Sequence, residues 1–490
     1  MNRPKARLPR GFRDRGPAEI AAERAVLETV RRVYESYGFS ALETPAFEYT
    51  DALGKFLPDV DRPNEGVFSL QDDDGQWLSL RYDLTAPLAR YVAANFQHLT
   101  KPFRRYQLGP VWRNEKPGPG RFREFLQFDA DTVGSASPSA DAELLMMLAD
   151  TLEALGLKRG EYIVKLNNRK LLDGVIETAG IRLDDRARRG TVMRAIDKLD
   201  RLGIEGVKAL LGKGRKDESG DFTKGAELGD EAIGSVLMFV VSKEPIIQNS
   251  YEATHSQISY AISKSEIGKV GLSEIDAIHS ILRSCGYGND RIRFDTGIVR
   301  GLDYYTGPVF EAQLTFPVQN EAGETVVFGS VAGGGRYDDL VARFTGQQVP
   351  ATGVSIGVSR LISALASRGL SAASQPLVVV TVMDKADAAA SFQTVAELRA
   401  AGLRAEAYVG TGKFGDQMKY ADRRGAAIAV IEGGDERARG EVTLKDLALG
   451  AELAKSVESR AAWTANRQAQ FSVRRADLVA EIKKLLSGRS

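Results

Sequence analysis

A composition break near residue 376 constrains the fold of this chain most strongly. The segment ASRGLSAASQP ends at Pro376, and the hydrophobic runs LVVVTVM, RAEAYV and AAIAVIEGG follow it. Helical patterns that start near Asp387 and Asp416 separate these runs. Strict alternation of strands and helices predicts a small α/β domain with a largely parallel sheet. We therefore expect a separate domain over residues 376–490.

The remaining chain is long enough for at least one more domain, because 490 residues exceed what a single hydrophobic core usually organises. Hydrophobic residues make up 43% and charged residues 27%, as in water-soluble globular proteins. The basic N-terminus is not followed by the apolar stretch of a secretory signal, and no apolar run is long enough to span a membrane. These features predict a cytoplasmic protein that does not bind membranes.

The few cysteine and histidine residues exclude several kinds of site. Cys285 is the single cysteine, so no disulfide can form within the chain. His98, His255 and His279 are widely spaced, which argues against a zinc site and against histidine-based acid–base catalysis. Lysine and arginine number 66 against 65 acidic residues. This balance neither indicates nor excludes a nucleic-acid partner, because phosphate recognition depends on local patches.

The first 170 residues combine helices with a long hairpin. Residues 17–37 carry apolar residues at helical spacing after a proline, and Gly38 ends the pattern. The segment FSALETPAF then reads as a strand ended by Pro45. Two strand-like runs between residues 103 and 133 flank the loop RNEKPGPGR and predict a hairpin. A further helix is expected from Asp141, with that aspartate as the N-cap.

The segment from about residue 169 to 285 differs in sequence pattern from the residues on either side. It carries short helical patterns and a charged segment, GKGRKDESGDF, that looks like an exposed loop. Strand patterns and glycine turns return over residues 290–365. We therefore expect an insertion at 169–285 between two parts of one domain, 1–168 and 286–370.

One glycine-rich loop suggests a dinucleotide site. Residues 410–415, GTGKFG, match G-x-G-x-x-G between a strand and a helix, and Glu432 lies near the distance of a ribose ligand. The loop follows the second strand of its domain, however, whereas the fingerprint belongs to the first. A Walker phosphate loop is excluded, since Phe414 and Ala407 occupy positions that require Ser or Thr and Gly.

The hairpin around residue 113 is a stronger candidate. In its second strand, FREFLQFDAD, the polar residues Gln127, Asp129 and Asp131 share one face, because side chains alternate with period two. A solvated sheet face remains the alternative. The hairpin also carries guanidinium groups suited to bidentate phosphate binding, from Arg113, Arg121 and Arg123, together with Glu115. Such a loop beside carboxylates would hold an anion and an amine together.

Two further segments combine charge with glycine. Residues 300–305, RGLDYY, place a cation, an acid and two phenols together, and GGGRYDDL follows at 333–340. Glycines there would let a ligand approach the backbone. In GVSIGVSRL, residues 353–361, Arg360 lies in the first turn of a helix, where an acidic residue would suit the helix dipole better. A structural role alone therefore explains these segments poorly.

Together these motifs resemble class II aminoacyl-tRNA synthetases, and in detail histidyl-tRNA synthetases. The resemblance runs through nearly the whole chain: the opening PRGFRD at 9–14, a motif 1 helix and strand ending at Pro45, the hairpin as motif 2 and Arg360 in motif 3. The segments at 300–305 and 333–338 are similar to the two signatures peculiar to the histidine enzymes.

The resemblance implies an α+β catalytic domain built on an antiparallel sheet with helices, a homodimer formed through motif 1, and a C-terminal α/β anticodon-binding domain. It also implies the partners L-histidine, ATP with Mg²⁺, and tRNA(His). By motif, the histidine pocket would consist of Asp83, Thr85, Gln127, Asp131, Arg300, Tyr304 and Tyr305. The ATP site would consist of Arg113, Glu115, Arg121 and Arg360, the last on the γ-phosphate of a bent ATP.

The implied reaction attaches histidine to ATP and then to tRNA. The histidine carboxylate attacks the α-phosphate in line, and no general base is needed, because the nucleophile is already ionised. Both reactants are anionic, so catalysis depends on placement and positive charge. The resemblance assigns Arg300 and Arg113 to the α-phosphate, and magnesium to the β- and γ-phosphates. The adenylate then passes histidine to the 3′ end of tRNA.

The chain departs from the family pattern at two places. Gly118 stands where the motif 2 loop commonly has glutamine, so recognition of the tRNA acceptor end and of an extra 5′ guanosine is open. Asp83 and Asp131 replace the glutamates of many bacterial members, which keeps the charge but shortens the side chains.

Two alternatives differ in function. A synthetase-like regulatory subunit of ATP phosphoribosyltransferase would usually lack the C-terminal domain and have eroded signatures, and a dinucleotide enzyme would leave the arginine motifs unexplained. Within the insertion, Lys208, Lys213, Arg215 and Lys216 would contact the tRNA acceptor stem, with a solvated charged loop as the alternative.

Overall fold

The computed structural model describes residues 3–53, 66–117, 122–182, 184–196, 198–216, 222–240, 251–298, 305–319, 325–368, 370, 375–383, 388–447, 449–450 and 469–487. The chain forms two compact units, residues 1–372 and 373–490. No helix in the described ranges is long and apolar enough to cross a membrane.

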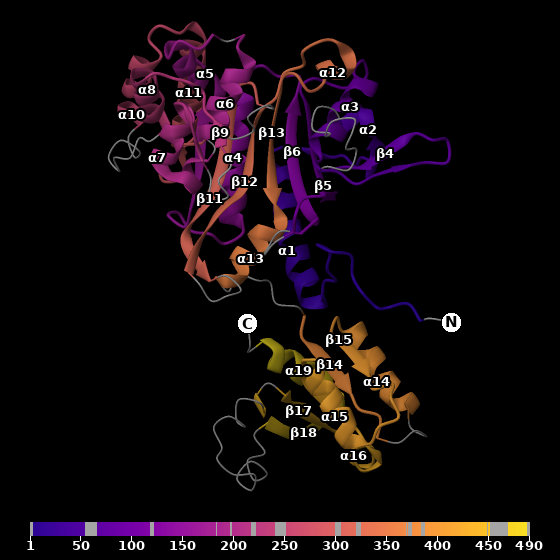
Figure 1. Cartoon of the computed structure of the whole chain (residues 1–490). Helices are drawn as coiled ribbons and strands as arrows, with labels where there is room; N and C mark the ends of the chain where they lie inside the picture. Colours follow the sequence, from indigo (N-terminus) through magenta and orange to yellow (C-terminus); the bar gives the residue numbers. More distant parts are fainter. Residues whose placement is uncertain are drawn as a thin grey trace. The chain divides into compact units, whose positions relative to one another are not determined.

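The first unit is organised around an eight-stranded sheet with the order β1-β5-β6-β13-β12-β11-β7-β10 (Figure 1). Its pairs are antiparallel except at the two edges, where β1 runs parallel to β5 and β10 parallel to β7. The strands are β1 (Ser40–Ala41), β5 (Phe103–Trp112), β6 (Glu124–Val133), β7 (Tyr162–Asn168), β10 (Ile292–Phe294), β11 (Pro308–Gln319), β12 (Thr325–Arg336) and β13 (Ala351–Gly357).

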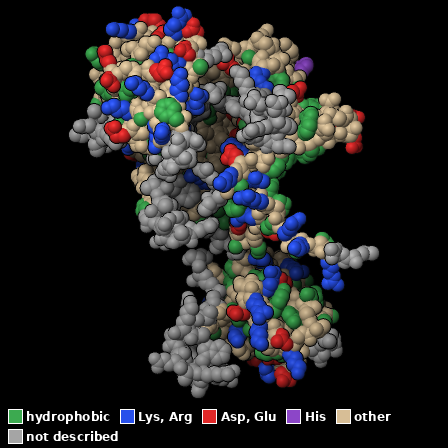
Figure 2. All heavy atoms as spheres, viewed as in Figure 1, with side chains coloured by type: hydrophobic (Ala, Val, Ile, Leu, Met, Phe, Trp, Pro, Cys, Tyr) green, Lys and Arg blue, Asp and Glu red, His purple; other side chains and the backbone are tan. Residues whose placement is uncertain are grey.

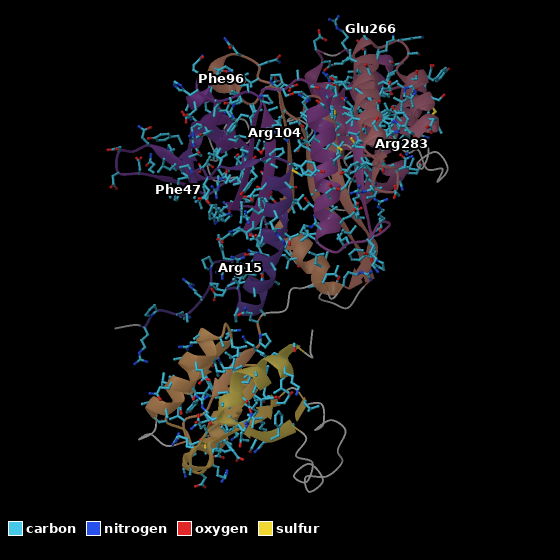
Figure 3. All side chains as sticks on the ribbon, turned by 180° about the vertical axis from the view of Figure 1, so that it is seen from behind. Arg15, Phe47, Phe96, Arg104, Glu266 and Arg283 are labelled. Atoms are coloured by element: carbon cyan, nitrogen blue, oxygen red, sulfur yellow. The ribbon has the colours of Figure 1, made fainter. Side chains whose placement is uncertain are left out.

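Helices α1 (Pro17–Ser36), α4 (Pro138–Ala154) and α13 (Val358–Ser367) pack on one face of this sheet. Their apolar residues form one core with strand residues such as Phe128 and Ala130, which are almost fully buried. Arg104 reaches this side too: its guanidinium lies over the Phe39 ring and donates to the Tyr37 carbonyl at 2.7 Å (Figure 3). The opposite face of β6 is thereby left for polar side chains.

The region predicted as an insertion forms a helical group at one side of the sheet (Figure 1). Its elements are α5 (Arg169–Thr178), α6 (Arg186–Ile196), α7 (Leu199–Leu211), β8 (Gly214–Lys216), β9 (Phe222–Lys224), α8 (Asp230–Val240), α10 (Tyr251–Ala261) and α11 (Glu266–Ser284). α5 and α11 approach closely because both have glycine at the contact: a Cβ on Gly174 would lie 2.7 Å from the Cα of Gly268.

A small sheet projects on the other side of the unit (Figure 1). Its strands, in the order β2-β4-β3, are β2 (Phe47–Tyr49), β4 (Trp77–Leu80) and β3 (Ser69–Gln71). The neighbouring helices are α2 (Thr50–Leu53), α3 (Thr85–Asn95) and α12 (Ala342–Thr345). Glu48 in β2 and Arg90 in α3 join the small sheet to α3 by a bidentate ion pair at 2.8 and 3.0 Å.

The second unit has a five-stranded sheet with the order β15-β14-β16-β17-β18. The three strands predicted from the alternating pattern are parallel, and the two later strands add in antiparallel orientation. The elements are β14 (Leu377–Val380), α14 (Ala388–Ala400), β15 (Arg404–Ala407), α15 (Phe414–Arg423), β16 (Ala426–Ile431), α16 (Gly434–Arg439), β17 (Glu441–Asp446), β18 (Gln470–Arg474), a 3₁₀ turn (Arg475–Asp477) and α19 (Leu478–Ser487).

Three local predictions were wrong. The helix expected from Asp141 begins at Pro138, and Ser137 caps it by accepting from the Ser139 amide; Asp141 is instead buried in an ion pair with Arg336. The strand expected over FSALETPAF is limited to Ser40–Ala41, because this edge strand pairs with β5 over only two residues. The segment expected as an exposed loop near residue 215 is exposed at Lys213 and Lys216, but its ends form the antiparallel pair β8–β9, and residues 217–221 lie outside the described residues.

Candidate active site

The polar face of β6 lies at the centre of the large sheet. Its residues occupy two lateral rows, since paired residues on neighbouring strands share a face. In one row Asp131 lies between Arg105 on β5 and Gly353 on β13, and Gly335 on β12 follows. In the next row Asp129 lies between Gln107 and Ser355, and Gly333 and Glu311 follow. The sequence-predicted face is thus a real cluster, and it lies within the sheet instead of on a solvated surface.

Glycines on β12 and β13 let the backbone lie close to this cluster. A Cβ on Gly353 would lie 2.0 Å from Oδ1 of Asp131, and one on Gly335, in the same row, would lie 2.5 Å from the Pro308 carbonyl oxygen. A side chain at either position would therefore displace the backbone or the carboxylate. This explains the glycine run before Arg336 that the sequence left without a structural reason.

Asp131 is held from two sides. Nη2 of the fully buried Arg105 lies 2.9 Å from Oδ2, and the same nitrogen donates to the Leu84 carbonyl at 3.0 Å. The Tyr337 hydroxyl donates to the other carboxylate oxygen. Burial raises the pKa of Asp131, and Arg105 and Tyr337 oppose that rise. The carboxylate is therefore fixed in position before any ligand binds.

Asp129 and Gln127 share a hydroxyl on β13. Nε2 of Gln127 donates to Oγ of Ser355 at 3.0 Å, and Ser355 also hydrogen-bonds to Asp129. Burial, and then the neighbouring charge of Asp131, raise the pKa of Asp129 to about 8. In the described part of the chain, Oε1 of Gln127 and Oδ1 of Asp129 are buried without a hydrogen-bond partner.

Asp83, just before the start of α3, is the third carboxylate of the cluster. Its Oδ1 accepts from the amides of Thr85 and Ala86 at 3.1 and 2.9 Å, so it caps the helix. Burial raises its pKa, while these amides and the nearby Arg113 lower it. Three carboxylates, Asp83, Asp129 and Asp131, therefore lie close enough to influence one another electrostatically.

Arg113 stands at the end of the hairpin, beside this acidic cluster. Its Nε donates to the Tyr82 carbonyl at 3.3 Å, and its guanidinium lies 5.1 Å from the centre of the Phe125 ring. The N-terminal segment packs against the end of the same hairpin, where the Arg123 amide donates to the Gly11 carbonyl at 2.9 Å. Gly11 adopts φ +84°, and a Cβ there would lie 2.9 Å from the Arg123 side chain, so this turn requires glycine.

The other predicted residues fall into two groups. Thr85 is partly buried at the start of α3, Glu115 is exposed, Arg360 lies in the first turn of α13, and Tyr305 packs beside Gly335. Arg121, Arg300, Tyr304 and the departure at Gly118 lie outside the described residues. Figure 2 shows a hollow in the first unit, with acidic and basic side chains at its edge.

The sequence reasoning missed four residues of the cluster: Arg105, Tyr337, Ser355 and Glu311. Arg105 had a usable signal, because the first strand of the hairpin must place alternate residues beside Gln127, Asp129 and Asp131. Tyr337 had been noted only as part of a signature. Ser355 and Glu311 belong to strands more than 180 residues away in the chain, and their register with β6 is a product of the tertiary fold.

In the second unit, the backbone of the glycine-rich loop is hydrogen-bonded to neighbouring side chains of the same unit. The Gly412 amide donates to the Tyr408 hydroxyl at 3.2 Å, and Gln417 donates to the Gly412 carbonyl at 3.3 Å. Glu432, the expected ribose ligand, is buried and accepts from Thr394 at 3.0 Å. These contacts argue against the dinucleotide alternative.

Comparison with known proteins decides the family. A model of the histidyl-tRNA synthetase family matches residues 11–361, and an anticodon-binding domain model matches residues 377–485. The chain belongs to the histidyl-tRNA synthetase family. It is 58% identical to the histidine–tRNA ligase of Rhizobium leguminosarum bv. trifolii over 492 residues, which cover 99% of this chain and 96% of that protein. The histidine–tRNA ligase of Rhizobium meliloti is also 58% identical, over 489 residues.

Solved structures agree with this family assignment. Histidyl-tRNA synthetase from Nostoc sp. PCC 7120 has a TM-score of 0.74 and 31% identity, covering 98% of this chain and all of that one. A Bacillus halodurans structure described as an ATP phosphoribosyltransferase regulatory subunit/histidyl-tRNA synthetase has a TM-score of 0.66 at 22% identity, which supports the fold alone. The class II fold with a separate C-terminal domain is thus confirmed.

Proposed function

We propose that this chain is a histidine–tRNA ligase, which activates L-histidine with ATP and transfers it to tRNA(His). The observation that carries the proposal is the acidic cluster of Asp83, Asp129 and Asp131 beside Arg113. It offers carboxylates for a cationic amino acid and a guanidinium for a phosphate in one site. High identity to histidine–tRNA ligases along nearly the whole chain supports the same activity. The regulatory-subunit alternative is disfavoured because the anticodon-binding domain is present.

In the proposed complex, Asp83 and Gln127 hold the histidine ammonium, with Thr85 beside them. Asp131 accepts an imidazole N–H, and Tyr304 and Tyr305 complete the pocket. The fixed position of Asp131 between Arg105 and Tyr337 supports this role, since a preorganised acceptor selects a ring that carries a donor. The shorter Asp side chains keep the negative charge of the family's glutamates.

The ATP half of the proposal depends on arginines. Arg113 bridges the α-phosphate and the histidine carboxylate, Glu115 lies near the adenine, and Arg121 and Arg360 bind the phosphates. Arg300 stabilises charge that develops on the α-phosphate. Magnesium bound to ATP would supply further positive charge at the β- and γ-phosphates. Among the described residues no group of three His, Cys, Asp or Glu side chains could hold a metal ion.

Transfer RNA engages other parts of the proposed enzyme. The anticodon reaches the domain of residues 376–490, and the insertion at 169–285 approaches the acceptor stem. Lys208, Lys213 and Lys216 are exposed near β8, with Arg215 partly buried between them. Replacing all four together should weaken tRNA charging but leave adenylate formation intact. Unchanged charging would favour the solvated-loop alternative. The segments 1–168 and 286–370 form the catalytic domain, and a cytoplasmic location stays a prediction.

The small sheet, whose strand β2 begins just after the motif 1 segment that ends at Pro45, supports the homodimer expected through motif 1. Its outer face leaves Phe47, Tyr49 and Leu70 exposed at 43%, 56% and 46%, and the strand pairing places all three on one face with Leu78 (Figure 3 labels Phe47). An apolar face of this kind usually marks a protein interface. Changing Tyr49 to Asp should produce monomers in analytical ultracentrifugation. Tyr260→Asp, at an exposed tyrosine in the insertion, should leave the dimer intact.

Amino-acid-dependent exchange of pyrophosphate into ATP tests the activity directly. We expect exchange with histidine and with none of the other nineteen standard amino acids, and its loss in an Arg113→Ala variant. Exchange with a different amino acid would keep the class and overturn the substrate. Absence of exchange both with and without tRNA would overturn the activity.

A further inference from the structure

The orientation of the Gln127 amide is set by Ser355 and Asp129, to which the proposed complex assigns no contact with the substrate. Gln127 lies on β6, and its Nε2 donates to the Ser355 hydroxyl at 3.0 Å. Ser355 is directly opposite Asp129 in the β6–β13 pairing, and its hydroxyl lowers the pKa of Asp129 as a hydrogen-bond donor. Asp129 is 2% exposed, so water does not compete for this contact.

The number of available protons determines which group donates in each of these hydrogen bonds. An ionised carboxylate only accepts, and a serine hydroxyl has a single proton to give. When Asp129 is ionised, the Ser355 proton therefore points to Asp129, and the Ser355 oxygen is left to accept. Only the NH₂ end of Gln127 can satisfy that oxygen. The reversed amide would place two acceptors against each other.

The consequence is that the carbonyl oxygen of Gln127 faces the other way. This oxygen is buried and has no hydrogen-bond partner in the described part of the chain. A buried acceptor without a donor is costly unless a ligand supplies one. The nearby carboxylates, Asp83 and Asp131, favour a donor that is positively charged. An ammonium group meets both requirements.

We propose that Asp129 and Ser355 are positioning residues that hold the Gln127 carbonyl oxygen toward the substrate ammonium. They thereby make the site select amino acids with a free, protonated amine. The inference rests on the proposed placement of the histidine ammonium beside Gln127 and adds the reason for its orientation. Neither Asp129 nor Ser355 needs to touch the substrate.

The same arrangement makes histidine binding depend on the protonation of Asp129. Burial, and then Asp131 and Asp83, raise its pKa, and Arg105 and Ser355 lower it. Gln107, opposite on β5, is engaged with Thr44 and does not bond to Asp129. A proton on Asp129 would let its hydroxyl donate to Ser355, and Ser355 could then donate to the amide oxygen of a turned Gln127. The KM for histidine should therefore rise as the pH falls, beyond the change that histidine's own titration causes.

The test compares four variants by pyrophosphate exchange at pH 8.5, where Asp129, with its pKa of about 8, is mainly ionised: Ser355→Ala, Ser355→Thr, Asp129→Asn and Gln127→Ala. Ser355→Ala should raise the KM for histidine about tenfold, the effect of losing one hydrogen bond to a charged group, with the KM for ATP unchanged. Ser355→Thr keeps the hydroxyl and should stay within about twofold of the parent. Ser330→Ala is the matched control, because its hydroxyl donates to the Ala332 carbonyl and contacts neither Gln127 nor Asp129.

Two inhibitors separate the amine from the rest of the substrate. Histidinol has the ammonium and lacks the carboxylate, whereas 3-(imidazol-4-yl)propionate has the carboxylate and lacks the amine. Ser355→Ala and Asp129→Asn should weaken histidinol binding by about the factor seen for histidine and leave the propionate unchanged. The pH dependence of the histidine KM should also flatten in both variants.

The outcomes distinguish the inference from the function on which it rests. If Gln127→Ala binds histidine normally, the proposed pocket is wrong. If Gln127→Ala is impaired but Ser355→Ala and Asp129→Asn are not, the pocket stands and the positioning role is overturned. Equal loss in Ser355→Ala and Ser355→Thr would also overturn it, because packing and not the hydroxyl would then matter.

Discussion

Replacing Arg105 by methionine tests how the acidic cluster is stabilised. Arg105 is fully buried, and its Nη2 pairs with Asp131 at 2.9 Å and with the Leu84 carbonyl at 3.0 Å. Methionine fills much of the same volume but leaves Asp131 as a buried charge with Tyr337 as its remaining partner. Removing one member of a buried pair costs about 3–5 kcal/mol.

The expected change in melting temperature follows from the size of the unit. The unit spans residues 1–372, and an unfolding entropy of about 2.1 cal/mol/K per residue gives it roughly 0.8 kcal/mol/K in total. The loss therefore corresponds to a decrease of about 4–6 °C in the first transition, measured by calorimetry without ligands. The variant should recover as the pH falls toward about 4, because a raised folded-state pKa lets Asp131 take up a proton that relieves the unpaired charge.

A double variant provides the control. Arg105→Met together with Asp131→Asn removes the unpaired charge and keeps an oxygen for the Tyr337 hydroxyl. It should regain at least half of the lost stability. If Arg105→Met costs less than about 1 kcal/mol, or if the double variant is no more stable, then Arg105 does not compensate Asp131 and the reasoning fails.

Three further predictions concern the same region. Gly353→Ala should reduce the rate of pyrophosphate exchange about 100-fold, because its Cβ would lie 2.0 Å from Asp131; Gly357→Ala, with 3.5 Å to its nearest neighbour, should lose far less. Asp129→Asn should have a higher melting temperature than the parent protein at pH 8.5, and the difference should become small near pH 5. The folded-state pKa of Asp129 is about 8, so the stability of the parent falls as the pH rises from about 4 through 8, and asparagine removes this pH dependence. Equal slopes would refute it. Asp141→Ala should lose about 3–5 kcal/mol in urea unfolding, since the buried Arg336 loses its closest carboxylate and keeps only the longer contact with Asp338 at 3.7 Å among the described ion pairs; a loss below about 1 kcal/mol would contradict this.

Local patterns in the sequence predicted the elements around the site well. Strand alternation placed Gln127, Asp129 and Asp131 on one face, and the structure brings them together with Asp83 and Arg113. Helix 17–37 ends within one residue of its predicted boundary, because proline and glycine mark its two ends. These features depend on residues close in the chain, where periodicity and capping act directly.

Other features depend on contacts that no local pattern contains. Asp141 has the residue type of an N-cap, yet Ser137 and Pro138 begin the helix earlier and free Asp141 to pair with Arg336, 195 residues away. The contact between Ser355 and Asp129 likewise depends on the register of two strands that meet only in the folded sheet. The roles of Arg300 and Tyr304 stay predictions, since both lie outside the described residues.

The arrangement around Asp131 also bears on how the proposed enzyme would reject other amino acids. Arg105 and Tyr337 fix this carboxylate before substrate binds, so much of the cost of burying it is met during folding. A side chain without an N–H donor would cover Asp131 and leave it without the partner that histidine supplies. Sites built on a buried polar partner can reject analogues that lack it by about 10⁴-fold or more, whereas hydrophobic pockets separate similar side chains by only about 10–200-fold. If Asp131 accepts the imidazole N–H as proposed, no separate editing step is needed to exclude leucine or phenylalanine, and Asp131→Ala should weaken that discrimination more than it slows the α-phosphate chemistry.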